Sequence, residues 1–184
     1  MTATAAPSAV KRQRPNILVT GTPGTGKTTL SELVALALGY EHINVSELVK
    51  AHSLHDGYDE AFDTFILNDD KLCDELEEQL GAATGGYVVD FHTCDVFPER
   101  WFDLVVVLRT DNTVLYDRLT ERGYSDKKRS ENVECEIMQV VLEEARESYQ
   151  EEIVVELQSD TVEQMESNTE RIQEWAKAWL ANNA

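Results

Sequence analysis

One short segment constrains the fold more than any other part of this sequence. Residues 21–28 read Gly-Thr-Pro-Gly-Thr-Gly-Lys-Thr, which matches the spacing G-x-x-x-x-G-K-[ST] in full. A mostly apolar, strand-like run precedes the segment at residues 16–20, and a helix-forming run follows it. A strand, a glycine-rich turn and a helix in this order predict a phosphate-binding loop, or P-loop.

The residue types in this loop indicate which chemistry it serves. Gly24 and Gly26 allow the backbone to curl, so that successive N–H groups point at phosphate oxygens beside the positive end of the next helix. Lys27 is expected to reach the β and γ phosphates, and the hydroxyl of Thr28 to coordinate Mg²⁺. The alternative is a chance match in a glycine-rich turn, and the flanking strand and helix argue against it. We therefore expect a nucleoside triphosphate to bind here.

Apolar runs alternate with helical patterns along the chain, which predicts an α/β fold with a parallel sheet covered by helices on both faces. The expected strands are residues 16–20, 42–45, 87–91, 104–108 and 153–157, and the expected helices are residues 27–38, 69–80, 111–122, 132–149 and 161–181. Residues 46–68 and 123–130 do not fit the alternation and are candidate mobile inserts. We expect one domain over residues 15–184, preceded by a flexible basic tail at residues 1–14.

The charge of the chain narrows its partners. There are 16 Lys and Arg residues against 35 Asp and Glu residues, for a net charge of −19. The tail holds three of the positive charges, so residues 15–184 keep 13 basic and 35 acidic residues, a net charge of −22. Such a surface repels a phosphate backbone, and direct RNA binding is not expected. The acidic runs are either solvated helix faces or a surface for a basic protein.

Two further features concern the surroundings of the protein. The apolar runs are far shorter than the roughly 20 residues that a membrane-spanning helix needs, so no membrane association is expected. Three widely spaced cysteines without a Cys-x-x-Cys pair argue against a disulfide framework and a structural zinc site. A reducing cytosolic or nuclear compartment fits this pattern best.

Two polar residues close the apolar run at residues 87–91. Asp90 could hold Mg²⁺ directly or through water at the end of a strand next to the P-loop, or it could only cap a turn. His92 shares a face with Asp90 if the strand continues, and it could then orient or deprotonate a water molecule. The alternative for His92 is a structural role.

Four basic residues are candidate phosphate ligands. Arg118 and Arg122 lie four residues apart on one expected helix face and could converge on transferring phosphates, or they could be solvated. Arg100 is a further candidate, with a surface salt bridge as its alternative. Lys50 is the only Lys or Arg between residues 28 and 70, so an acceptor phosphate entering that insert would meet few other cations.

Several motifs in fixed order resemble the adenylate kinase isoenzyme 6 family, including its fungal members. The resemblance covers residues 15–181 and is carried by GTPGTGKTT (21–29), INVSEL (43–48), DGYDE (56–60), VVDFH (88–92), FPERW (97–101), LRTDN (108–112), RLTERGY (118–124) and ESYQEEIVVELQSD (147–160). It implies a three-layer P-loop kinase fold with a nucleoside-monophosphate region at about residues 44–67 and a short lid at about residues 121–131. The two candidate inserts coincide with these regions.

The resemblance also implies an activity and its residues. It implies transfer of the γ-phosphoryl group of ATP to AMP or another monophosphate, together with ATP hydrolysis. Carried over by motif, Arg122 is a contact on the lid side, and Asp90 and His92 serve hydrolysis. The residues expected to bind ATP are Gly24, Gly26, Lys27, Thr28 and Thr29.

Finally, the resemblance implies a role in maturation of the small ribosomal subunit and its pre-rRNA, within the pre-40S particle. The implied partner is a basic small-subunit ribosomal protein, and the implied location is the nucleus and cytoplasm. Two hypotheses follow: a nucleoside-monophosphate kinase, or an ATP-switched assembly factor with little kinase activity. Lys50 stands where such kinases usually present arginine, which favours the second. A GTPase is a weaker third hypothesis, because no Asn-Lys-x-Asp element reads guanine.

Overall fold

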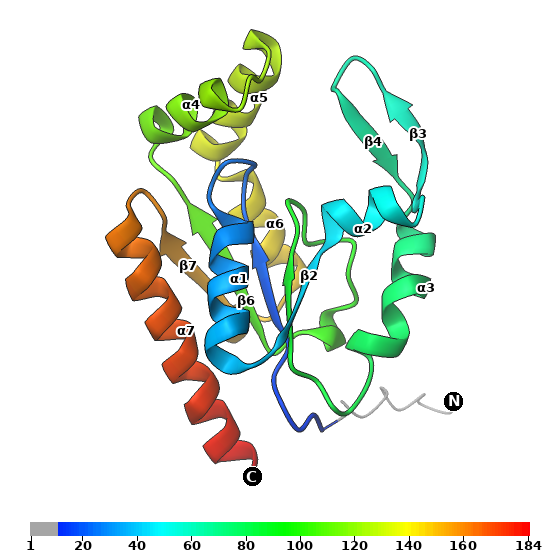
Figure 1. The fold of residues 1–184 in the computed structure, drawn as a ribbon, viewed down its shortest axis with the longest axis vertical. Helices are drawn as coiled ribbons and strands as arrows, with labels where there is room; N and C mark the ends of the chain where they lie inside the picture. The colour runs from blue at the N-terminus through cyan, green and yellow to red at the C-terminus, as the bar shows by residue number, and fades with distance from the viewer. Residues whose placement is uncertain (1–10) are drawn as a thin grey trace, which may run out of the picture.

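The computed structural model describes residues 11–184 and is built around a five-stranded sheet. The strand order is β2-β5-β1-β6-β7, and every neighbouring pair is parallel (Figure 1). The strands are β1 (Ile17–Thr20), β2 (Glu41–Asn44), β5 (Tyr87–Asp90), β6 (Leu104–Arg109) and β7 (Val154–Gln158). The predicted five-stranded parallel sheet is therefore confirmed, and each strand lies within one residue of its expected bounds.

Helices cover both faces of the sheet, which gives three layers (Figure 1). In β1, Ile17 and Val19 pack with helices on one face, while Leu18 packs with helices on the other. All three side chains are fully buried, as expected for strands covered on both sides. The first face is covered by α1 (Lys27–Leu38) and α7 (Val162–Asn183), and the second by α3 (Asp69–Leu80) and α6 (Val140–Ser148).

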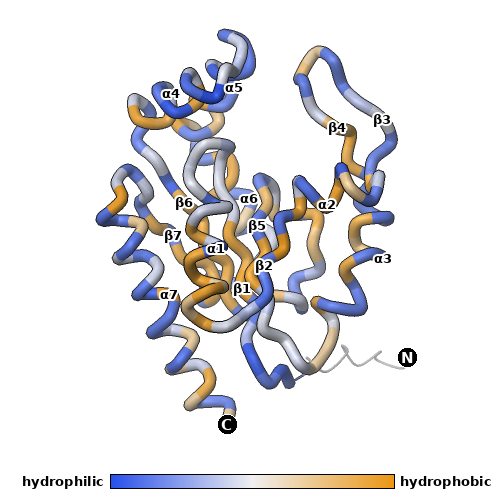
Figure 2. The backbone as a smooth tube through the Cα atoms, viewed as in Figure 1, coloured by the Kyte–Doolittle hydropathy of each residue, from blue (hydrophilic) through white to orange (hydrophobic). Residues whose placement is uncertain are grey.

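Helix α3 shows how the sequence pattern sets this packing. Leu72, Leu76 and Leu80 recur every four residues and are buried against the sheet. The acidic residues between them face solvent, and Figure 2 shows the resulting contrast with the apolar strands. Asn68 caps the helix, because its side chain accepts a hydrogen bond from the backbone N–H of Lys71. Both α1 and α3 occupy the predicted residues.

The first insert, residues 45–67, is more regular than its composition suggested. It contains α2 (Val45–Ala51) and an antiparallel hairpin of β3 (His55–Asp59) and β4 (Thr64–Leu67). The side chain of Asn44 caps α2 by accepting a hydrogen bond from the N–H of Glu47. We call residues 45–67 the hairpin insert.

The second insert differs from the prediction. It consists of α4 (Asn112–Glu121) and α5 (Asp126–Ile137), which we call the helical insert. Helix α5 begins early because Ser125 caps it, accepting a hydrogen bond from the N–H of Lys128. The single helix expected at residues 132–149 is wrong, because the chain takes a left-handed conformation at Gln139, with φ of 59°, and separates α5 from α6.

The chain enters the sheet through an ordered segment rather than a flexible tail. Arg12 is buried and forms an ion pair with Asp103 at 3.2 Å, and the N–H of Gln13 donates to the carbonyl of Ala83. The prediction of a flexible tail is therefore wrong for residues 11–14. Arg12 supplies the charged partner that the partly buried carboxylate of Asp103 needs, and this ion pair holds the segment in place. Residues 1–10 of that prediction lie outside the described residues.

Two short helical turns, η1 (Glu99–Trp101) and η2 (Glu151–Ile153), precede β6 and β7. No helix formed by residues 11–184 combines the length and the apolar character needed to cross a bilayer.

Candidate nucleotide site

The P-loop connects β1 to α1 at the carboxyl end of the sheet. Gly24 and Gly26 have φ angles of 95° and 91°, which favour glycine. A Cβ atom on Gly24 would also lie 2.8 Å from Cδ1 of Leu115 on α4. The loop therefore adopts a curled backbone that packs directly on the helical insert.

Within the loop, the carbonyl oxygen of Thr22 is the central acceptor. It receives hydrogen bonds from the side-chain ammonium of Lys27 at 3.1 Å and from the hydroxyl of Thr25 at 2.8 Å. The N–H of Thr25 also donates to it, at 3.2 Å. These bonds fold the Lys27 side chain back over the loop, where a phosphate could take the place of the carbonyl.

Arg118 braces the loop from outside. Its guanidinium donates hydrogen bonds to the carbonyl oxygens of Gly24 at 3.2 Å, Ser159 at 2.9 Å and Asp160 at 2.9 Å. Arg118 thus holds the loop against the start of α7, and it is not among the residues that line the cleft. The two alternatives predicted from the sequence are contact with transferring phosphates and a solvated helix face. The observed contacts, which are with backbone carbonyl oxygens, match neither.

Three side chains meet beside the loop. The hydroxyl of Thr28 donates to one carboxylate oxygen of Asp90 at 3.1 Å, and Nε2 of His42 contacts the other oxygen. Asp90 is 3% exposed at the end of β5. His42 is not among the residues predicted for the site, and it reaches Asp90 from the neighbouring strand β2.

The Thr28 hydroxyl and the Asp90 carboxylate suit Mg²⁺, which prefers oxygen ligands and usually keeps water and phosphate oxygens in its shell. Within residues 11–184, no group of three or more His, Cys, Asp or Glu side chains gathers into a metal cluster. These two residues would therefore share the ion with the phosphates of a nucleotide rather than enclose it.

Lys27 is held in an unusual electrostatic state. Its pKa is lowered to about 8, chiefly by burial; the charge of Asp90 opposes this shift, that of Arg122 contributes to it, and that of Glu136 opposes it. A triphosphate placed at the loop would add negative charge and favour the ammonium form. Burial disfavours the Lys27 ammonium in the free protein, and an ion pair with a bound phosphate would offset that cost.

His92 lies on the wall of the cleft, where its ring packs edge-on to Phe91 with centroids 4.3 Å apart. Although solvent reaches the side chain, its pKa is lowered to about 4, chiefly because the surrounding protein displaces water and also because of the charge of Lys27. The imidazole is therefore neutral at pH 7 and can accept a hydrogen bond.

The turn that carries His92 is anchored by Glu144 of α6. One carboxylate oxygen accepts hydrogen bonds from the hydroxyl of Thr93 and the N–H of Cys94, both at 2.7 Å. The Tyr149 hydroxyl donates to the carbonyl of Cys94, also at 2.7 Å. Helix α6 therefore fixes the segment after β5.

A cleft of about 1010 Å³ lies between the P-loop and the two inserts. Figure 1 shows the hairpin insert and the helical insert on opposite sides above the P-loop end of the sheet. Basic residues reach the cleft from each side: Lys27 from the loop, Lys50 from the hairpin insert, and Arg122 and Lys128 from the helical insert and the turn after α4. The other lining residues include Thr28, Asn44, Ser46, Tyr58, Phe62, Phe65, Asp90, His92, Asn132 and Cys135.

The two inserts touch across this cleft. The ammonium of Lys128 donates to the carbonyl oxygen of Asp63 at 2.9 Å and lies 3.4 Å from its carboxylate. The ammonium of Lys127 lies 5.1 Å from the ring centroid of Phe62. Helix α5 thus contacts the tip of the hairpin.

Most residues predicted for the site line the cleft or lie at the P-loop, and Arg100 does neither. Lys27, Thr28, Asp90, His92, Arg122 and Lys50 line the cleft, Gly24 and Gly26 shape the loop, and Thr29 lies exposed in the first turn of α1. Arg100 precedes β6 at the amino end of the sheet and pairs with Glu77 at 2.7 Å. The structure therefore does not bring Arg100 to the cleft, and its alternative, a surface salt bridge, describes the observed contact.

Comparison with known proteins agrees with this architecture. Residues 17–139 match a family model described as an AAA domain. Of the solved structures, shikimate kinase from Acinetobacter baumannii in complex with shikimate superposes with a TM-score of 0.63, covering 94% of this chain and 98% of that one at 15% identity. This likeness concerns the fold alone, which is that of the P-loop kinases.

Curated sequences give a much closer match. The adenylate kinase isoenzyme 6 homolog of Caenorhabditis elegans is 58% identical over 90% of this chain and 91% of its own length. The homolog of Dictyostelium discoideum is 53% identical over 95% of this chain and 98% of its own length. With such identity along almost the whole of both sequences, and with the P-loop, Asp90 and the two inserts arranged around one cleft, the chain belongs to the adenylate kinase isoenzyme 6 family.

Proposed function

We propose that this protein transfers the γ-phosphoryl group of ATP to AMP or another nucleoside monophosphate, and that it also hydrolyses ATP. One observation carries the proposal: a single cleft holds the P-loop with Lys27 on one side and Lys50 of the hairpin insert on another. Donor and acceptor phosphates could therefore meet within it. The name adenylate kinase in the curated relatives supports the same activity.

Five residues of the cleft have roles in this proposal. Lys27 and Arg122 would bind the donor phosphates and stabilise the charge that spreads over them during transfer. Thr28 and Asp90 would hold Mg²⁺, which supplies further neutralisation of that charge. Lys50 would bind the acceptor phosphate as a single positive charge.

His92 would serve the competing reaction with water. With a pKa of about 4 it is a weak base, so we propose that the neutral ring orients a water molecule more than it deprotonates it. Closure of the inserts around AMP would exclude that water and favour transfer.

The test is ATP turnover with and without AMP in the presence of Mg²⁺. We expect AMP-dependent formation of ADP in the wild-type protein, and loss of turnover by at least about a hundredfold in Lys27→Met, because a cation at the transferring phosphate is removed. Lys177→Met, an exposed change on α7, is the matched control. Absence of AMP-dependent ADP formation would refute the kinase proposal, and undiminished turnover in Lys27→Met would refute the role of the loop.

A second proposal concerns the partner. We propose that the protein acts in maturation of the small ribosomal subunit by binding a basic ribosomal protein within the pre-40S particle, in the nucleus and cytoplasm. The net charge of −22 over residues 15–184 and the solvent-facing acids of α3 support a basic partner. The same negative charge repels the phosphate backbone of RNA and disfavours direct contact with it.

The assembly proposal has its own test. We expect the affinity for a purified basic small-subunit ribosomal protein to differ between the ATP-bound, ADP-bound and nucleotide-free states, because nucleotide contacts would reorder the inserts. Identical affinity in all three states would contradict a nucleotide switch.

A further inference from the structure

A buried carboxylate on α5 reaches the P-loop. Glu136 is 3% exposed, and one of its carboxylate oxygens accepts a hydrogen bond of 2.6 Å from the hydroxyl of Thr22. Thr22 is itself 2% exposed, so this contact is shielded from water. Hydrogen bonds to a charged acceptor in such surroundings are stronger than those between neutral groups.

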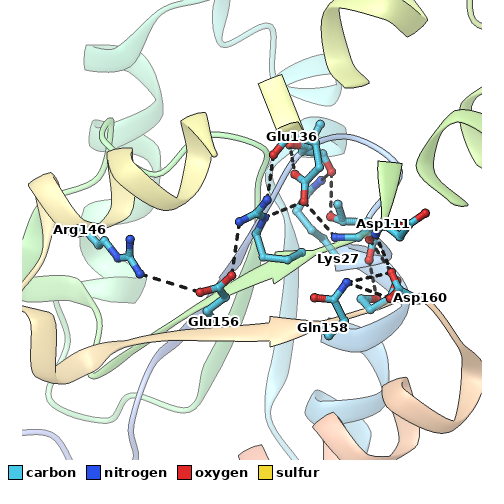
Figure 3. A network of polar contacts seen from close by, with 12 residues as sticks. Lys27, Asp111, Glu136, Arg146, Glu156, Gln158 and Asp160 are labelled. Carbon is cyan, nitrogen blue, oxygen red and sulfur yellow. Dashed lines mark hydrogen bonds and ion pairs between the residues drawn. The ribbon is translucent and has the colours of Figure 1, made fainter. Parts of the chain in front are cut away.

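The charge of Glu136 is balanced without Thr22. Its second carboxylate oxygen accepts from Nε of Arg109 at 2.7 Å and from the N–H of Thr110 at 3.0 Å. Arg109 also donates to the backbone carbonyl of Glu136 at 2.8 Å. Figure 3 shows Glu136 at the centre of this network, which continues through Glu156 towards Arg146. The ion pair with Arg109 satisfies the buried charge, so the bond to Thr22 is additional.

Thr22 is also the residue that holds Lys27. Its hydroxyl is fixed by Glu136, and its carbonyl oxygen accepts from the Lys27 ammonium at 3.1 Å. Thr22 is thus held at both its side chain and its carbonyl oxygen. This limits the movement of the loop residue that the Lys27 ammonium contacts before it turns to a phosphate. Glu136 therefore acts on Lys27 without being a ligand of the phosphates.

The same helix contacts the other side of the cleft. Lys128, near the start of α5, donates to Asp63 of the hairpin insert, whereas Glu136 lies eight residues later, about 12 Å along the helix axis. Between them, Glu131, Asn132 and Cys135 line the cleft. Helix α5 thus spans from the acceptor side to the P-loop.

We propose that Glu136 is a positioning residue for phosphoryl transfer, which fixes Lys27 through the Thr22 hydroxyl and joins the P-loop to the helix that contacts the hairpin insert. This inference rests on the proposed turnover of ATP at the P-loop.

The test uses Thr22 so that the Arg109–Glu136 ion pair stays intact. Thr22→Val keeps the shape of the side chain and removes the donor, whereas Thr22→Ser keeps the donor. We expect Thr22→Val to lower kcat for ATP turnover about tenfold with KM for ATP changed less than about threefold, and Thr22→Ser to stay within about twofold of the wild type. Glu134→Gln, on the exposed face of α5, is the control for loss of an acidic charge from the same helix.

A double-mutant cycle that combines Thr22→Val with Glu136→Gln measures how strongly the two residues are coupled in their effect on kcat. Because Thr22→Val removes the donor and Glu136→Gln removes the charge of the acceptor of the same bond, we expect the double variant to turn over no more slowly than the slower single variant. Additive losses in kcat, an unchanged kcat in Thr22→Val, or an equal loss in Thr22→Ser would each overturn the positioning role. Melting temperatures measured in parallel identify any loss that reflects only the amount of folded protein.

The failure of the proposed function would be distinguishable. If the wild-type protein turned over no ATP, the proposed function would fail, and calorimetry with Mg·ADP would still test whether the bond from the Thr22 hydroxyl to Glu136 holds the loop in its phosphate-binding form. We expect Thr22→Val to bind Mg·ADP about threefold more weakly than both the wild type and Thr22→Ser. Equal affinities of the three proteins would overturn the inference.

Discussion

The P-loop and the hairpin insert border the same cleft but are built in opposite ways. The loop is packed against Leu115 and Leu119, both fully buried, and is tied by hydrogen bonds to α4, α5 and the segment before α7. The hairpin has only two strands, and its large apolar side chains Tyr58, Phe62 and Ile66 are each about half exposed. An isolated two-stranded hairpin is marginally stable.

The difference indicates that the two halves of the cleft are prepared to different degrees. The donor side is formed before any ligand arrives, so it orders little on binding. Under the proposed function, the hairpin side gains contacts when a monophosphate binds, and ordering it reduces the net affinity. We infer that ATP can bind without AMP, and that AMP completes the closed site.

The largest expected effect tests the rigid half directly. Leu119→Ala removes a buried side chain that backs Gly24, and we expect the free energy of unfolding to fall by about 3 kcal/mol. Ile66→Ala, on the half-exposed hairpin, should cost less than about 1 kcal/mol. Urea denaturation of both variants measures the difference. Equal losses would show that the hairpin is as tightly packed as the loop.

The next prediction separates the two halves by function. Lys50→Met removes the cation that the hairpin insert brings to the cleft. We expect KM for AMP to rise about tenfold, because a hydrogen bond from a charged group to the acceptor phosphate is lost. Turnover of ATP alone should stay at the wild-type rate, because the donor half is untouched. Steady-state assays with varied AMP give both numbers. Parallel loss of both activities would mean that the halves are not independent.

A pH profile probes the donor half. Because burial lowers the pKa of Lys27 to about 8, the free protein loses the Lys27 charge as pH rises through that value, and phosphate binding weakens. We expect kcat/KM for ATP to fall about fivefold between pH 8 and pH 9. A profile that stays flat to pH 9.5 would place the ionisation elsewhere.

The smallest expected effect concerns the contact between the inserts. Lys128→Met removes the partner of Asp63, and exposed ion pairs contribute little. We expect KM for AMP to rise about twofold, with ATP turnover unchanged. A rise beyond about tenfold would show that the contact largely assembles the acceptor side.

The sequence predicted the fold well where local signals decide it. The P-loop spacing, the apolar strands and the four-residue repeat of Leu72, Leu76 and Leu80 each depend on neighbours in the chain. The position of Arg100 also follows from local signals, because a residue before an expected strand lies at the opposite end of a parallel sheet from a loop that follows one. This favours its surface salt bridge over phosphate binding.

Other features depend on contacts between distant residues. Glu136 lies in a run with Glu131 and Glu134, and nothing local distinguishes the buried carboxylate from the solvated ones. Its burial follows from the meeting of Arg109 and Thr22, which are far away in sequence. His42 is similar, because it gains its partner Asp90 only when β2 pairs with β5.

The left-handed conformation of Gln139 separates α5 from α6, and the two helices contact different parts of the cleft. Before Gln139, α5 contacts the hairpin insert through Lys128 and the P-loop through Glu136. After it, α6 holds the turn that carries His92 through Glu144. A single helix through residues 126–148 would force both sets of contacts onto one axis. The interruption at Gln139 lets α5 hold the P-loop and the hairpin while α6, as a separate helix, holds the turn that carries His92.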